Sequence, residues 1–269
     1  MSPPNYFSFP LTRPRAAVCA LLFLSSVVTG TACLQGYRFP PEKLEKPKLQ
    51  IEKPRIDLPL GIKPAEAPAA RPNEKFERYV EEFVARPAGS ASFEDTTDYA
   101  VALVFLGRTG EAVDVLLALE QKRPGVYTTA TNLGTAYELM GDLEQAQAWI
   151  SKGLERNANS HEGTEWLHFA ILRAKLNLRS DPNWLQRHSV LDEAKGERSA
   201  AETMRAIEYQ LHERLHFVQP ADAVVCDLFY QAALLATGQA QRETRMQFLR
   251  ESLRFGEWRK TEVEKLLKA

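Results

Sequence analysis

The chain has 269 residues and a formal net charge of −1, with 34 basic residues against 35 acidic ones. This balance argues against nucleic acid as the main partner, because phosphate backbones are bound by strongly basic surfaces. Three cysteines in a chain of this length also exclude a disulfide-rich scaffold.

Residues 1–32 have the layout of a secretory signal peptide. They contain Arg13 and Arg15 but no acidic residue, and an apolar run from Ala16 to Val28 precedes the small residues 29–32. The run is shorter than the roughly 20 residues that a membrane-spanning helix needs. Its length therefore favours a signal peptide that is cleaved over an anchor that is retained.

Cleavage after Ala32 would make Cys33 the first residue, which resembles the signal of bacterial lipoproteins, where this cysteine is acylated. Such signals usually carry leucine three residues before the cysteine, and Gly30 stands there instead. Two outcomes stay open, lipid attachment at Cys33 or export with a free thiol. The expected location is the periplasm or, for a lipoprotein, the outer membrane, with secretion as the alternative. Cys226 is expected to be a small buried apolar residue.

Residues 33–72 are predicted to be a proline-rich extended tether. Eight of the chain's sixteen prolines lie between Phe39 and Pro72, spaced among lysine and glutamate. Proline at this density prevents helix formation, and the segment could reach on the order of 100 Å. Residues 73–92 then predict a capping helix, because Asn73 precedes a stretch with an apolar stripe and a charged back.

Residues 93–126 and 127–160 repeat one pattern at an interval of 34 residues. The matched pairs are Gly107 and Gly141, Glu111 and Gln145, Ala112 and Ala146, Leu116 and Ile150, and Pro124 and Ala158. Repetition at this interval predicts stacked helical hairpins. Small residues at the crossing, such as Gly134 and Ala100, would let the two helices of a hairpin approach closely, and Gly107 and Gly141 would end the first helices in left-handed caps.

The second copy carries Leu133-Gly134-x-x-Tyr137, then Gly141, Ala146, Ile150 and Gly153, and so resembles the tetratricopeptide repeat. The resemblance implies an all-α fold, an α-α superhelix of tetratricopeptide-like helical hairpins. Because two hairpins cannot bury a continuous core, further helical units must follow.

Residues 161–194 are interpreted as a divergent repeat and residues 195–269 as helical hairpins and a terminal cap. The predicted elements are helices over 160–172, 183–191 and from the capping box Ser199–Glu202, a hairpin of 224–237 with 241–255, and a polar cap over 257–268.

The repeat family binds partners in a concave groove lined by the first helix of each repeat, and matching positions predict the groove residues here. They are Asp98, Val101, Thr131, Asn132, Thr135, Glu138, Glu162, Glu165, Trp166 and Phe169. Trp166 is either the main anchor or a packing residue against Trp184 and Tyr137. Only Asn132 matches the residues that clamp carboxyl-terminal tails in this family, so the resemblance implies a neutral or basic protein or peptide.

Two patterns raise an enzymatic alternative. His212-Glu213-Arg214-Leu215-His216 fits the HExxH motif of zinc metallopeptidases, although Arg214 is unusual inside it and no third ligand is evident. His161, Glu165 and His168 could hold a metal from one helix face, or be ordinary helix-start and surface residues.

A phosphate-binding glycine loop, a nucleophile elbow and paired catalytic carboxylates are not found in the sequence. We therefore expect a non-enzymatic protein-protein interaction scaffold of the cell envelope, without cofactor or metal. The alternatives are a zinc metallopeptidase centred on His212 and a structural component of an envelope assembly.

Overall fold

The computed structural model describes residues 34, 36, 37 and 74–268, and over these ranges it is helical without any strand. The all-α class is therefore confirmed. The predicted signal peptide, Cys33 and nearly all of the predicted tether lie outside the described residues. None of the described helices combines the length and the apolar character that crossing a membrane requires.

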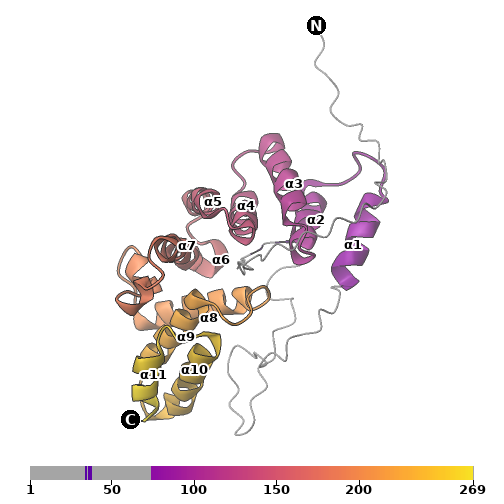
Figure 1. The fold of residues 1–269 in the computed structure, drawn as a ribbon. Coiled ribbons are helices and arrows are strands. Elements are labelled where there is room, and N and C mark those ends of the chain that lie inside the picture. Colours follow the sequence, from indigo (N-terminus) through magenta and orange to yellow (C-terminus); the bar gives the residue numbers. More distant parts are fainter. Residues whose placement is uncertain (1–33, 35, 38–73, 269) are drawn as a thin grey trace.

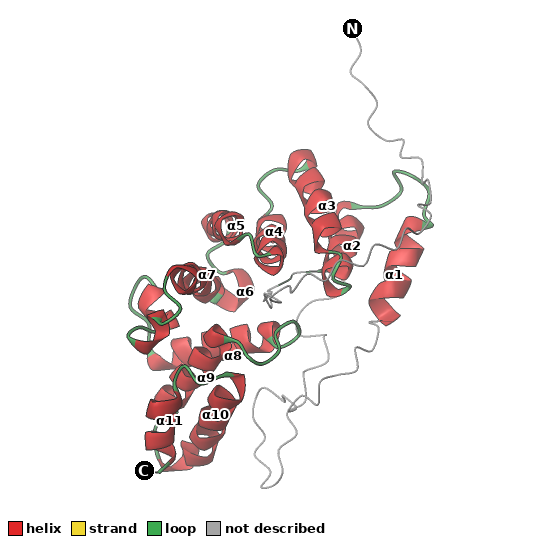
Figure 2. Cartoon of the chain, in the orientation of Figure 1, coloured by secondary structure: helices red, strands yellow, loops and turns green. Residues whose placement is uncertain are grey.

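The helices follow one another along the chain with short connections (Figure 2). Their bounds are α1 Glu74–Val84, α2 Phe93–Phe105, α3 Thr109–Lys122, α4 Tyr127–Met140, α5 Leu143–Arg156, α6 Ser160–Gly163, α7 Glu165–Ser180, α8 Ala200–Arg214, α9 Ala223–Leu235, α10 Arg242–Phe255 and α11 Lys260–Leu267. Short 3-10 turns lie at Trp184–Gln186, Val190–Glu193 and Gln239–Gln241.

Helices α2 and α3 form one hairpin and α4 and α5 the next, as the 34-residue interval predicts. Small residues allow each pair to approach. A methyl group added at Gly134 would lie 2.5 Å from the side chain of Ile150, and Ala100 and Ala112 are 0% exposed. Close approach of the backbones at Gly134 therefore depends on the absence of a side chain.

Helix ends are encoded locally. Gly107 and Gly141 adopt left-handed conformations with φ of 72° and 82°, as predicted for residues that end the first helix of each hairpin. Ser92 and Ser199 each cap a helix by accepting a backbone N–H, and the carboxylates of Asp95 and Glu202 reach back to complete a capping box.

Two large apolar cores and a small joint hold the helices together. The first core joins α1 to α4, and the second joins α7 to α11. Between them, Ala146 and Ile150 of α5 pack against Leu172 of α7. Figure 1 shows the hairpins placed in sequence order along a curved row, with α4, α6 and α8 on its inner side. Cys226 is buried in the second core, as predicted.

The third predicted hairpin departs from the sequence interpretation. The expected helix over 160–172 breaks at residues 161–163 before α7 begins. The predicted helix over 183–191 is wrong, because 3-10 turns stand there. The N–H of Val190 donates to the buried carboxylate of Asp227 at 2.7 Å, and Arg259 donates to the same carboxylate and to the His188 carbonyl. These long-range bonds replace the helical ladder.

Leu34, one residue after Cys33, belongs to the first core. Its side chain is 2% exposed and shares the apolar cluster with Phe76 and Tyr79 of α1 and Val101 of α2. The backbone N–H of Tyr37 donates a hydrogen bond to Oδ1 of Asp98 on α2. The start of the predicted tether is thus in contact with the helical body.

Candidate functional site, a polar face with a buried charge cluster

Helix α4 carries a polar stripe that is buried. Thr128, Thr131, Asn132, Thr135 and Glu138 recur at helical spacing and are all between 0% and 8% exposed. The stripe borders the contact with α5, because Gly134 packs on Ile150 and a Cβ added at Gly153 of α5 would lie 2.6 Å from Cγ2 of Thr131. At its C-terminal end, Glu138 meets residues of α7 and α8.

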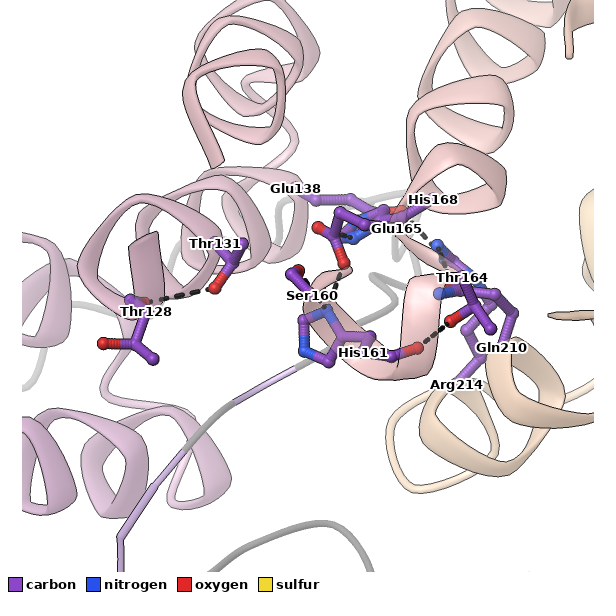
Figure 3. Close-up of polar contacts among 10 residues, drawn as sticks. All are labelled: Thr128, Thr131, Glu138, Ser160, His161, Thr164, Glu165, His168, Gln210 and Arg214. Carbon is purple, nitrogen blue, oxygen red and sulfur yellow. Dashed lines mark hydrogen bonds and ion pairs between the residues drawn. The ribbon is translucent and has the colours of Figure 1, made fainter. Parts of the chain in front are cut away.

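Glu138 is the centre of a buried charge cluster. Its carboxylate accepts from Nη1 of Arg214 at 3.0 Å and from Nε2 of His168 at 2.7 Å, and Nζ of Lys175 lies 2.9 Å away. Arg214 also donates to Oε1 of Gln210 at 3.3 Å. Helices α4, α7 and α8 each contribute, so residues more than 70 positions apart meet here (Figure 3).

Glu165 forms the second half of the cluster and links two imidazoles. Its Oε2 accepts from Nδ1 of His161, and its Oε1 lies 3.3 Å from Nδ1 of His168. A carboxylate only accepts, so the bonded Nδ1 of His161 carries a proton. Among the described residues, Nε2 of His161 has no hydrogen-bond partner, although the side chain is buried.

Electrostatics keep both carboxylates ionised. Burial by itself would raise the pKa of Glu138, but attraction to Arg214, Lys175 and His168 outweighs it and holds the pKa well below its usual value. Burial likewise opposes ionisation of Glu165, and the charge and hydrogen bonds of His161 and His168 reverse the effect and lower its pKa. The cluster therefore neutralises its own carboxylates.

A left-handed turn aims His161 into the cluster. His161 and Glu162 have φ of 51° and 55°, an uncommon conformation for residues with a Cβ, and Gly163 follows with φ of 76°. The His161 carbonyl accepts from the backbone N–H of Thr164 at 3.0 Å and from its hydroxyl at 2.7 Å. Such backbone strain is concentrated at functional sites in proteins, which singles out this turn.

Seven of the ten predicted groove residues are buried, and three are not. The buried ones are Asp98, Val101, Thr131, Asn132, Thr135, Glu138 and Glu165. Glu162 is exposed, because the left-handed turn directs it away. Trp166 is half-buried under the guanidinium of Arg198, 3.8 Å from its ring, and contacts the second core. Phe169 is also half-buried, against the small joint.

Sequence matching to the repeat did not place six residues of this cluster in the groove. They are Ser160, His161, His168, Lys175, Gln210 and Arg214. Arg214 gave one usable indication, since it continues the apolar face of Ile207 and Leu211 on α8, where a charge needs a buried partner. The left-handed turn that places His161 has no such indication in the sequence.

The HExxH segment does not form the arrangement expected of a zinc peptidase. Helix α8 ends at Arg214, so His216 lies beyond it. The rings of His212 and His216 pack edge to face, with their centroids 5.4 Å apart. Arg214 points to Glu138. Within the described part of the chain, no group of three or more His, Cys, Asp or Glu side chains is placed to hold a metal ion. The set of His161, Glu165 and His168 is therefore not such a group either.

His216 is expected to make stability depend on pH. Burial first, then the nearby charges of His212 and Lys75, lower its pKa from 6.5 to about 4. The unfolded chain therefore binds this proton first as pH falls, and the stabilising contribution, complete above pH 6.5, is lost by about pH 4. Because the ring is partly exposed, we expect a loss of about 2 kcal/mol.

Urea unfolding at pH 7 and pH 4 checks this expectation. The His216→Gln variant should lose about 2 kcal/mol less than the wild type over that interval. His188→Gln is the matched control, since the His188 side chain is 48% exposed, and it should follow the wild type. Identical pH profiles for wild type and His216→Gln would contradict the assignment.

Comparison of the chain with protein families and with curated proteins finds no match to either.

Proposed function

We propose that this protein is a non-enzymatic binding scaffold, in which helical hairpins of the tetratricopeptide kind form a superhelix and present a polar inner face to an extended segment of a partner protein. The observation that carries the proposal is the buried polar stripe of α4, which is accompanied by buried polar residues on α2, α7 and α8. A helix that only packs would carry apolar residues at these positions.

Hydrogen-bond acceptors on this face suit the backbone of a peptide. Asp98 accepts a backbone N–H, that of Tyr37. A peptide supplies N–H donors at regular spacing whatever its side chains are. The buried carboxylates on and beside this face, Asp98, Glu138 and Glu165, favour a neutral or basic ligand over an acidic one.

Binding of defined peptides tests the proposal. An array of neutral, basic and acidic octapeptides, read by fluorescence polarisation, should yield ligands from the neutral and basic sets. Combining Asp98→Asn with Thr131→Val, two nearly isosteric changes, should weaken them about thirtyfold, since each removes a polar contact worth about 1 kcal/mol. Asp114→Asn on the exposed side of α3 is the control. Equal affinities for all three proteins would contradict the proposal.

The cellular setting belongs to the same proposal. Export through residues 1–32, with acylation of Cys33, would place the scaffold in the cell envelope, in the periplasm or at the outer membrane. Intact mass of the protein purified from membranes distinguishes an acylated Cys33 from a free thiol. A mass corresponding to the unprocessed chain would contradict cleavage.

Two alternatives have their own tests. A zinc peptidase would contain stoichiometric zinc and lose proteolysis in His216→Ala, but the geometry of α8 supports binding better. A structural component of an envelope assembly would cross-link in membranes to a fixed neighbour through its terminal helices. The polar inner face has no evident purpose in that case.

A further inference from the structure

We propose that Leu34, Gly36 and Tyr37 occupy the peptide-binding face in cis, and that a partner peptide must displace them. The docking of this segment is independent of the proposed function, whereas the competition rests on it. The proposal also defines the ligand as an extended segment with an aliphatic side chain three residues before a backbone N–H.

The aliphatic side chain supplies the first contact. Leu34 is 2% exposed and shares the first core with Val101, one of the predicted groove residues. Complete removal of a leucine side chain from water is strongly favourable, and the burial holds the chain against the first core at this point.

A backbone donor supplies the second contact. The N–H of Tyr37 donates to Oδ1 of Asp98, which lies one helical turn before Val101 on α2. Asp98 and Val101 thus occupy neighbouring positions on one face of α2. Asp98 is only 1% exposed, so its carboxylate is removed from bulk water, where a charge-assisted hydrogen bond is strong.

The ring of Tyr37 adds little to recognition, because the residue is 48% exposed. Its backbone is therefore what α2 recognises. A competing segment needs an aliphatic residue at the position of Leu34 and a residue other than proline at the position of Tyr37, because proline has no N–H.

Hydrogen exchange at the Tyr37 amide tests the docking. The protein used is residues 33–269 with Cys33→Ser, which contains every described residue. The Tyr37 amide should exchange at least about tenfold more slowly than an unprotected amide. Asp98→Ala and Leu34→Ser should each abolish the protection, and Asp114→Ala should retain it. Exchange of the wild-type amide at the unprotected rate would overturn the docking.

A peptide added in trans tests the competition. A fluorescent peptide of residues 33–37, with serine in place of Cys33, should bind the Leu34→Ser/Tyr37→Pro variant at least about tenfold more tightly than the wild type. Leu34→Ile/Tyr37→Ala keeps both contacts and should bind like the wild type. Equal binding by the wild type and the Leu34→Ser/Tyr37→Pro variant would overturn the competition. A protected Tyr37 amide together with a peptide array that yields no ligand would support the docking and contradict the proposed function.

Discussion

Replacing Arg214 with methionine is expected to lower the free energy of unfolding by about 3 kcal/mol or more. Arg214 is fully buried, and its Nη1 donates to Glu138 at 3.0 Å. Methionine fills a similar volume, but it removes one of the positive charges that stabilise the buried Glu138 carboxylate. Lys175 and His168 still contact that carboxylate. Urea unfolding followed by circular dichroism at pH 7 measures the difference.

Arg179→Met is the matched control for the loss of an arginine from an ion pair. Arg179 pairs with Glu144, and their side chains are 52% and 61% exposed, so the change should cost less than about 1 kcal/mol. Combining Arg214→Met with Glu138→Gln should be less destabilising than the sum of the two single changes, because the double variant no longer buries the Glu138 charge without Arg214. Equal costs for Arg214→Met and Arg179→Met would show that the buried ion pair does not stabilise the fold.

Replacing Gly134 with leucine is expected to destabilise the protein by about 3 kcal/mol. A Cβ at this position would lie 2.5 Å from Cγ1 and Cδ1 of Ile150 and 3.1 Å from its backbone nitrogen. Ile150 is itself fully buried and cannot rotate into solvent, so α4 and α5 would have to separate. The separation would also shift the polar stripe of α4, and thermal unfolding together with peptide binding would report both effects.

Gly110→Ala is the control for adding a side chain to a helical glycine. No atom lies within 4 Å of a Cβ built at Gly110, and the residue has no left-handed φ. Alanine there should leave stability unchanged or raise it by up to about 1 kcal/mol. If Gly134→Leu were as well tolerated as Gly110→Ala, the close crossing of α4 and α5 would be refuted.

Hairpin positions could be predicted from the sequence because the relevant forces are local or periodic. The interval of 34 residues predicted α2 to α5, the positive φ of Gly107 and Gly141 followed from the lack of a Cβ, and the capping box at Ser199 marked the start of α8. Each of these features depends on residues within one or two helical turns of one another, so the pattern along the sequence contains all the residues that determine it.

Most of the candidate site could not be predicted in the same way. The sequence identified α4 and its polar residues, but Glu138 meets Arg214 across 76 positions, and nothing local indicates which carboxylate neutralises a buried arginine. The HExxH pattern likewise gives no sign that Arg214 pairs with Glu138 of α4 or that α8 ends before His216.

By itself the sequence determined that this chain forms helical hairpins, where the first two begin and end, and which side of α4 is polar. Only the tertiary structure decided that His161 lies in a left-handed turn facing Glu165, that Glu138 and Arg214 share one buried site, and that Leu34 is buried in the first core. The physical reason is that helix formation is governed by neighbours along the chain, whereas compensation of a buried charge and burial of a lone apolar side chain depend on residues that only folding brings together.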